Sequence, residues 1–225
     1  FAVASMGFRG EALASISSVS RFTLTSQRND EPSGCRIQMS DEEGLKPSPW
    51  SGRKGTTVFV EDLFYNVPVR AKFLRSPQVE YAHCYEALTA LAIGNPHINF
   101  TLIHNGKEKL CVVTPPSLQN HREKLLRERL KKIYALKTTE NFLYLTHKNT
   151  YGRFEGLIST PGESKATTKH MTCFVNKRWV KDKNLRYGIL RGYHTHLLKG
   201  NYPQIIGFIE CDPSLVDVNV HPAKT

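Results

Sequence analysis

A glycine-spaced turn near the start of the chain has the residue types that hold phosphate. Gly7 and Gly10 flank Arg9, and a helix-forming stretch follows from Glu11 to Ser18. Paired glycines let a backbone approach a ligand closely, and the first turn of a helix directs free N–H groups and the positive end of its dipole at an anion. Arg9 could add a charge-assisted hydrogen bond to a phosphate oxygen. By pattern alone an ordinary capped turn is the stronger alternative, and the sequence of a P-loop does not occur.

Positive charge is concentrated in two segments of the second half of the chain. The 225 residues carry 31 Lys+Arg against 20 Asp+Glu, a formal net charge of +11. Residues 122–137 and 177–199 each hold seven basic residues and together account for the whole excess. A surface of this kind attracts a polyanion such as nucleic acid. For residues 122–137 a solvated helix face is an equal alternative, because acids are interleaved and Leu126, Leu130 and Ile133 form a stripe at helical spacing.

The cysteine and histidine patterns argue against metal and nucleophilic chemistry. Five cysteines are irregularly spaced without a C-x-x-C pair, and nine histidines form no H-E-x-x-H pattern. We therefore expect no metal site, and cysteines that are buried thiols in a reducing compartment. His221 before Pro222 is better explained as part of a rigid loop than as a catalytic group, because no Ser or Cys nucleophile stands in a recognisable motif. The sequence contains no uninterrupted run of about 18 apolar residues, so it predicts no membrane-spanning helix. It also contains no recognisable signal peptide.

The sequence predicts alternating strands and helices, and these elements must position the residues named above. Period-two patterns favour strands at 20–27 and 56–60, and Asn105-Gly106 predicts a hairpin between strands 98–104 and 109–113. Ser76-Pro77 begins a helix that Gly94-Asn95-Pro96 ends.

The second half repeats this alternation. A helix is expected over the basic segment 122–137 and another near 184–198, closed by Gly200. Strands are expected near residues 142–147, 153–159, 171–176 and 204–211. The fold class is therefore α/β or α+β in two layers, with a domain boundary at Thr114 to Ser117.

One stretch is specific enough to indicate a family. Residues 7–20, Gly-Phe-Arg-Gly-Glu-Ala-Leu-Ala-Ser-Ile-Ser-Ser-Val-Ser, resemble the signature of the MutL family of DNA mismatch repair proteins. Further blocks agree in order over essentially the whole chain, and their spacing fits bacterial members better than eukaryotic ones. These blocks are residues 55–58 (GTTV), 62–68 (DLFYNVP) with Arg70 and 72–74, 174–178 (FVNKR) and 217–224 (DVNVHPAK).

The resemblance implies a site for ATP and Mg²⁺ of the GHKL type. It assigns Gly55 and Thr56 to the adenine side, and Lys224, with Asn219 on the same loop, to the γ-phosphate. A lysine is a point charge on a flexible stem, which suits it to sense a terminal phosphate and so couple nucleotide state to domain arrangement. The lid over the phosphates would be formed by Gly7, Arg9, Gly10, Glu11, Ala12 and Leu13.

The resemblance also implies weak, sequence-nonspecific binding of single- or double-stranded DNA in a groove of the second domain. Lys183 matches a position that is usually arginine, so the charge is kept but the guanidinium fork is lost. Arg178, Lys181 and Arg186 are the expected neighbours. Aromatic residues among these charges could stack bases, although aromatic residues in a helix are more often core; they are Trp179, Tyr187 and Tyr193.

The fold implied by the resemblance is α+β. Residues 1–114 would be the later part of a GHKL (Bergerat-type) α/β sandwich, and residues 118–225 a ribosomal-protein-like β-α-β transducer domain. The family's water-activating Glu, Mg²⁺-holding Asn and adenine-reading Asp-x-Gly-x-Gly are expected before Phe1, which opens the chain without an initiator Met and indicates a fragment. We expect the 225-residue chain alone neither to bind ATP tightly nor to hydrolyse it, and its longer parent to be a weak ATPase.

The implied parent is an ATP-driven, homodimeric matchmaker that links a MutS-type mismatch recognition protein to a downstream endonuclease or helicase. It would act in the bacterial cytoplasm at the nucleoid, without a membrane partner. Two alternatives stay open. A topoisomerase-type ATPase subunit is disfavoured by residues 7–13 and the His-Pro-Ala-Lys loop, and a nucleic-acid-binding module without nucleotide dependence would lack ATP-dependent dimerisation.

Overall fold

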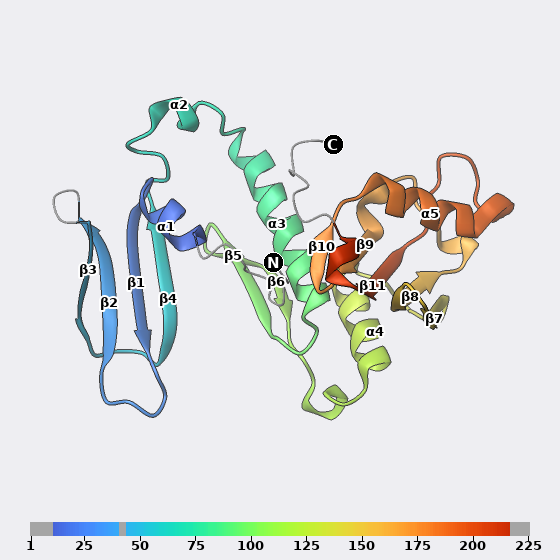
Figure 1. Ribbon diagram of the computed structural model, residues 1–225, viewed down its shortest axis with the longest axis horizontal. Coiled ribbons are helices and arrows are strands. Elements are labelled where there is room, and N and C mark those ends of the chain that lie inside the picture. Colours follow the sequence, from blue (N-terminus) through green and yellow to red (C-terminus); the bar gives the residue numbers. More distant parts are fainter. Residues whose placement is uncertain (1–10, 41–43, 217–225) are drawn as a thin grey trace. The chain divides into compact units, whose positions relative to one another are not determined.

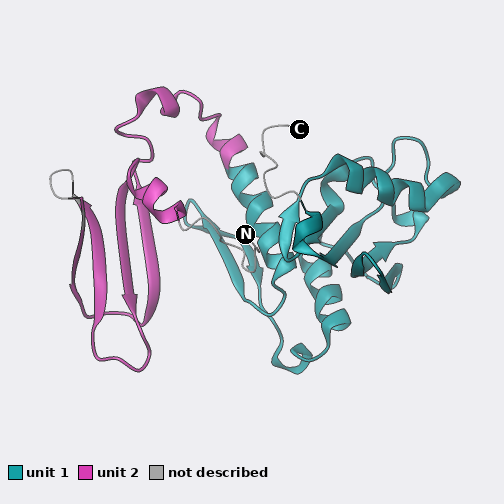
Figure 2. Ribbon diagram, viewed as in Figure 1, with its two compact units in different colours: residues 1–6, 81–225 teal, residues 7–80 magenta. Residues whose placement is uncertain are grey.

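A computed structural model describes residues 11–40 and 44–216 of the chain. The chain forms two compact units, one of residues 7–80 and one of residues 1–6 with 81–225 (Figure 2). Strands and helices occur in both units, which confirms the predicted mixed class (Figure 1).

The smaller unit is built on an antiparallel sheet in the order β3-β2-β1-β4. Its strands are β1 Arg21–Gln27, β2 Gly34–Ser40, β3 Gly44–Trp50 and β4 Gly55–Glu61. The strands expected at 20–27 and 56–60 are therefore confirmed. A short helix, α1 Ala12–Ser17, leads into β1, and a second, α2 Pro68–Ala71, follows β4.

The larger unit contains a five-stranded sheet in the order β10-β9-β11-β8-β7. Strand β11 pairs antiparallel with β8 and parallel with β9. Parallel neighbours need a crossover connection, and helix α5 Lys183–Tyr193 lies in the chain between them, giving the implied β-α-β unit. The strands are β7 Phe142–Asn149, β8 Gly152–Ser159, β9 Met171–Val175, β10 Arg178–Val180 and β11 Ile205–Cys211.

Two further predictions for this unit are confirmed. Helix α3 spans Pro77–Gly94, and the hairpin of β5 Phe100–His104 and β6 Lys107–Val112 turns at Asn105-Gly106. Both turn residues have positive φ, 50° and 72°, as a type I′ turn requires. Short 3₁₀ turns complete the elements, at Pro116–Leu118, Pro161–Glu163, Thr168–His170, His194–His196 and Pro213–Leu215.

The core of the larger unit is shared by residues on both sides of the boundary expected at Thr114 to Ser117. Helix α4 Arg122–Ile133 contributes the apolar stripe that the sequence indicated, and α3 and β6 contribute from before the boundary. The boundary itself stays a prediction. The buried cluster comprises Ala92, Ile93, Leu110, Val112, Leu126, Leu130, Ile133, Phe142, Leu157, Phe174 and Ile206.

Two expectations need correction. The helix expected near 184–198 ends at Tyr193, because His194 has a φ of 47° that an α-helix cannot continue. The expectation of buried thiols is wrong for three cysteines. All five are free, but Cys35, Cys84 and Cys111 are exposed and Cys173 is buried. Cys111 is exposed because burial in β6 alternates, with Leu110 and Val112 on the buried side.

Candidate functional site

Helix α1 presents the described part of the expected phosphate lid. Glu11 is the N-cap residue, and it makes no side-chain capping bond. Ala12 and Leu13 form the first turn and are exposed, Leu13 to 49%. Because the first N–H groups of a helix have no intrahelical acceptor, this turn can offer main-chain donors to an anion.

The junction between α1 and β1 is held by the turn after β4. The Phe64 N–H donates to the carbonyl of Val19 at 2.7 Å, and the Asn66 amide donates to the carbonyl of Ser18 at 2.9 Å. Asp62 and Phe64 both have positive φ, 50° and 68°, so the turn is a strained one that its surroundings must maintain. The block 62–66, which the sequence linked to function only by resemblance, therefore positions α1.

Gly55 and Thr56 lie at the start of β4. Gly55 has a φ of +101°, and nothing lies within 4 Å of where a Cβ would be, so a ligand could approach its backbone. The hydroxyls of Thr56 and Ser26 are 2.8 Å apart. Gly55 pairs with Gln27 at the end of β1 away from α1, six residues or about 20 Å along the strand. The structure does not bring Gly55 and Thr56 to the end of the sheet where α1 joins it.

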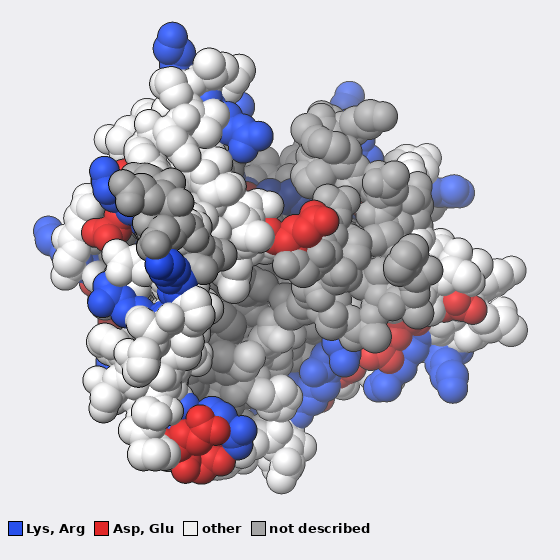
Figure 3. Space-filling view, turned by 60° about the vertical axis from the view of Figure 1, so that its left-hand side comes forward, with Lys and Arg blue, Asp and Glu red and all other residues white. Residues whose placement is uncertain are grey.

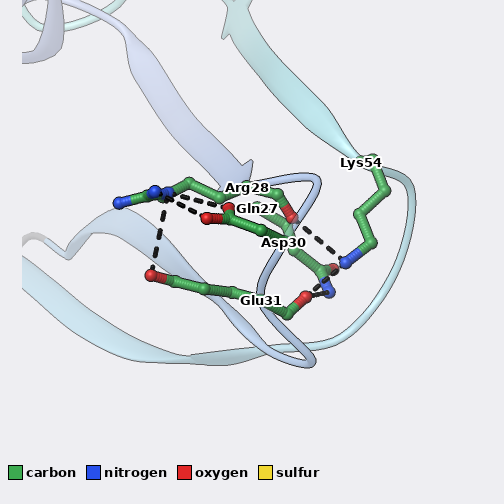
Figure 4. Close-up of polar contacts among 5 residues, drawn as sticks. All are labelled: Gln27, Arg28, Asp30, Glu31 and Lys54. Atoms are coloured by element: carbon green, nitrogen blue, oxygen red, sulfur yellow. Dashed lines mark hydrogen bonds and ion pairs between the residues drawn. The ribbon is translucent and has the colours of Figure 1, made fainter.

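A polar cluster fixes the chain just before Gly55 (Figure 4). The Lys54 ammonium donates to the carbonyl of Arg28 at 3.0 Å and to that of Glu31. The Gln27 amide donates to the carbonyl of Glu31 at 3.2 Å, and its oxygen accepts the Gly52 N–H at 3.1 Å. Gln27 is 5% exposed, so these two bonds of its side chain are shielded from water, whereas those of Lys54 are exposed. This cluster cannot be recognised from the sequence, because a lone Gln and a lone Lys beside turns form no pattern.

Five of the residues assigned to the nucleotide by resemblance lie outside the described residues. Their roles stay predictions. They are Gly7, Arg9, Gly10, Asn219 and Lys224.

The four residues assigned to DNA lie together on β10 and the start of α5. Arg178 begins β10, Lys183 begins α5 and is exposed, and Lys181 and Arg186 line one pocket. The turn before β10 is fixed by Asn176, whose side-chain amide exchanges two hydrogen bonds of 3.0 Å with the backbone of Cys211.

Lys181 has partners within the protein. Its Nζ lies 2.8 Å from a carboxylate oxygen of Glu86 on α3 and 4.6 Å from the centroid of the Trp179 ring. Asp182 caps α5 by accepting the Leu185 N–H at 2.7 Å, so a carboxylate already occupies the start of this helix. Phosphate here must be held by side chains of α5 and not by its first amides.

The pocket beside β10 and α5 has a volume of about 190 Å³. Its walls include Trp179, Tyr134 and Cys173, and its charged groups include Lys181 and Arg186. Burial raises the pKa of Tyr134 to about 12, and burial raises the pKa of the Cys173 thiol to about 11. Both groups are therefore neutral at physiological pH and serve as wall, not as acid or nucleophile.

The arginines of α4 decide how much of the first basic segment is free for a ligand. Arg129 is 3% exposed and donates to the carbonyls of Pro96 at 2.7 Å and Ile98 at 2.8 Å and to the Thr114 hydroxyl at 3.0 Å. Burial lowers its pKa from the ordinary value. Arg129 is thus a structural residue.

Two other arginines of α4 also have internal partners. Arg122 donates to Glu155 at 2.6 Å, and Arg127 donates to Glu123 at 2.8 Å and to the carbonyl of Thr139 at 2.6 Å. These contacts favour the structural interpretation for the arginines of the segment. Its exposed cations are lysines: Lys124, Lys131, Lys132 and Lys137.

Basic and acidic side chains are intermixed on the face that Figure 3 displays. Within residues 11–40 and 44–216, no group of three or more His, Cys, Asp or Glu side chains could hold a metal ion. No helix of the same residues is long and apolar enough to span a membrane.

Comparison with known proteins relates these residues to a family. Residues 130–225 match the family model described as DNA mismatch repair protein, C-terminal domain. The DNA mismatch repair protein MutL of Neisseria gonorrhoeae is 40% identical over 223 residues, 99% of this chain and 32% of that protein. MutL of Shouchella clausii is 35% identical over 224 residues, 100% of this chain and 33% of that protein. The chain therefore spans about a third of the length of the curated relatives that it matches.

Solved structures agree with the sequence relatives. The Aquifex aeolicus MutL ATPase domain complexed with ADP aligns with a TM-score of 0.68 and 29% identity, over 91% of this chain and 73% of that one. A second structure of the ATPase domain of the mismatch repair endonuclease MutL from A. aeolicus aligns with a TM-score of 0.68 and 26% identity. Since relatives align along essentially its whole length and share its fold, the chain belongs to the MutL family of DNA mismatch repair proteins.

Proposed function

We propose that the whole protein, a homodimer, binds ATP with Mg²⁺, hydrolyses it weakly, and uses ATP binding to drive dimerisation of its N-terminal parts. The dimer would link a MutS-type mismatch recognition protein to a downstream endonuclease or helicase, at the nucleoid in the cytoplasm. The observation that carries the proposal is the likeness to an ATPase domain complexed with ADP over 91% of this chain.

The described residues fit a nucleotide in part. The exposed first turn of α1 offers main-chain donors for phosphate, and the block 62–66 holds that helix in place. Gly55 also leaves room for close approach of a ligand to the backbone, but it lies at the end of β4 away from α1, so the described residues alone do not form one nucleotide site. Bound ATP would supply the phosphoanhydride whose hydrolysis resets the dimer. The residues described here would bind and orient the ATP. We propose that residues 1–114 and residues 118–225 form two domains.

The described residues hold no group of three or more His, Cys, Asp or Glu side chains that could hold a metal ion. We therefore assign no step to Mg²⁺ in this chain. The family resemblance implies that its protein ligand is an Asn of an upstream motif.

The nucleotide proposal is tested with the full-length protein. A nonhydrolysable ATP analogue should bring the N-terminal parts of two protomers together, measured by energy transfer between dyes attached to them. Lys224→Ala should weaken that response, whereas Lys107→Ala in the β5–β6 hairpin should not. Dimerisation that is indifferent to nucleotide would favour a nucleic-acid module without nucleotide dependence. The 225-residue chain alone should show no ATP hydrolysis above background.

DNA binding by the basic surface of β10 and α5 is a separate part of the proposal. If about five phosphates of duplex DNA are neutralised, the log–log slope of affinity against salt should be roughly −4 to −5. Lys183→Glu should weaken binding to all sequences alike, because a phosphate contact carries no base information. Lys107→Glu makes the same change of charge elsewhere on the surface. Unchanged binding by Lys183→Glu at low salt would remove Lys183 from the interface.

A further inference from the structure

The pocket beside β10 and α5 is lined by aromatic and by charged side chains. The charged ones are three cations and two carboxylates: Lys169, Lys181, Arg186, Glu86 and Asp182. Trp179 lies on the wall, and Lys181 and Arg186 also line the pocket. Lys183, the residue proposed to meet DNA, lies three positions before Arg186 and therefore on the same side of α5. A strand whose phosphates contact these cations would carry its bases past the pocket.

The size of the pocket favours a small planar group. Its volume of about 190 Å³ lies below the 300–1,000 Å³ typical of sites for drug-sized ligands. A single nucleobase is a group of this smaller class, and every base offers a flat face that stacks on an aromatic ring. Bases of duplex DNA are already stacked on one another, so only an unpaired base could enter.

The far wall of the pocket is held rigidly. The Tyr134 hydroxyl and the Thr172 hydroxyl are 2.8 Å apart, and the Tyr134 ring stacks on His170 at a centroid distance of 4.3 Å and an angle of 7°. Trp179 is set by the pairing of β10 with β9, opposite Phe174. Rigid walls reduce the entropy that ordering a ligand costs.

The entrance has a side chain that can exchange partners. Lys181 lies over the Trp179 ring and pairs with Glu86, and the two side chains of this ion pair are 52% and 44% exposed. An ion pair this exposed contributes little to stability, so its exchange for a phosphate is easy. Moving Lys181 to a phosphate would uncover the electron-rich face of the indole.

We propose that this pocket takes one unpaired base of single-stranded DNA, stacked on Trp179, while Lys181 moves from Glu86 to the adjoining phosphate. The inference rests on the proposed DNA binding by β10 and α5. It adds a preference for single strands that charge alone does not give.

The test uses indole fluorescence of the 225-residue chain. The chain has two tryptophans, so Trp50→Phe leaves Trp179 as the one reporter. An oligothymidylate should quench this emission at saturation, because a stacked base deactivates the excited indole. A duplex of the same length, and an abasic strand with the same number of phosphates, should bind with little quenching.

Affinity gives a second readout that does not depend on the reporter. Trp179→Leu should weaken binding of the oligothymidylate by about 5-fold or more, the loss of one stacked base, and leave duplex affinity unchanged. Tyr187→Leu, an exposed aromatic of α5 outside the pocket lining, is the matched control.

The outcomes separate the two proposals. Quenching by the oligothymidylate alone supports the pocket. Equal quenching by all three nucleic acids, or tight binding of the oligothymidylate without quenching, overturns the pocket and leaves DNA binding intact. Failure of every nucleic acid to bind at low salt overturns the DNA-binding proposal as well.

Discussion

At the scale of residues, some charged side chains of this protein hold elements of the fold together, and others are exposed on its surface. Arg129 illustrates the first use, because its guanidinium is buried and its bonds join α4 to backbone carbonyls and a hydroxyl. Lys183 illustrates the second, because it is exposed at the start of α5. A count of basic residues along the sequence cannot distinguish the two, since both contribute equally to the net charge.

Glu86 should restrain DNA binding, because it neutralises Lys181. Replacing it by glutamine frees the ammonium for a phosphate. We expect Glu86→Gln to bind duplex DNA more tightly at low salt, with a salt slope steeper by about 0.9, the value for one additional phosphate. Glu140→Gln, on an exposed residue outside this pair, makes the same change in net charge. Equal gains in both variants would show that only total charge matters.

Cys173 should make stability fall in alkali. Its pKa is about 11 in the folded protein and 9.0 as the ordinary value. Between these pH values the unfolded chain binds fewer protons than the folded one, so the free energy of unfolding decreases as pH rises, by at most about 1.4 kcal/mol per pH unit, and the loss ends above the folded pKa. Urea unfolding at pH 8 to 10 measures the slope. Cys173→Ala should flatten it and the exposed Cys111→Ala should not; the same slope in all three proteins would contradict the assignment.

At the scale of elements, the sequence predicted those that are marked by specific start, stop or turn residues. Helix α3 and the hairpin at Asn105-Gly106 were predicted, because their start, stop and turn residues are specific. Strand β3 carries Pro47 and Pro49, which argue against a strand, yet it lies at the edge of its sheet, where proline is tolerated. The end of α5 was missed because the φ of His194 is set by the fold and leaves no mark in the sequence.

The candidate site was predictable where residues are adjacent in the chain. The DNA-side residues of β10 and α5 cluster because 178–186 is one continuous segment. Glu86 could not be predicted, because it lies almost a hundred residues away and meets Lys181 only through the fold. The same holds for the contact of Asn66 with Ser18, which explains a block that the sequence could only match to a family.

The attachment of α4 depends on Arg129. Arg129→Met keeps the length of the side chain but leaves the carbonyl of Ile98 without its bond to the guanidinium. We expect the free energy of unfolding to decrease by roughly 2–4 kcal/mol, as for the loss of buried bonds to a charged group. Urea denaturation checks this value. Lys132→Met, on the exposed side of the same helix, should change stability by no more than about 0.5 kcal/mol; equal losses in the two variants would refute the structural role of Arg129.

At the scale of the whole molecule, the two units differ in how many apolar side chains each one buries. The buried hydrophobic cluster of the larger unit lies entirely between residues 92 and 206. In the smaller unit Val19 and Phe22 are buried, while Val58, Phe59 and Val60 are exposed in succession on both faces of β4. The larger unit has the apolar burial that independent folding needs, and the described part of the smaller unit does not.

Residues 76–225, which keep Ser76 before α3, should therefore fold when produced alone. We expect one cooperative urea transition, with circular dichroism and Trp179 fluorescence giving the same midpoint. Residues 7–75 alone should show no cooperative transition. Separate midpoints for the two probes in residues 76–225 would contradict the assignment of a single core.

The position of β11 has a consequence for the order in which this protein is made. It is the last strand among the described residues, yet it lies in the middle of its sheet, between β9 and β8. Until the ribosome has released residues 205–211, β7 with β8 and β9 with β10 exist only as separate hairpins, each with an open edge facing the place of the missing strand. The basic surface of β10 and α5 is thus joined to β8 and β7 only once residues 205–211 have been made, and a nascent chain stalled before Ile205 exposes two edges ready to pair with another chain.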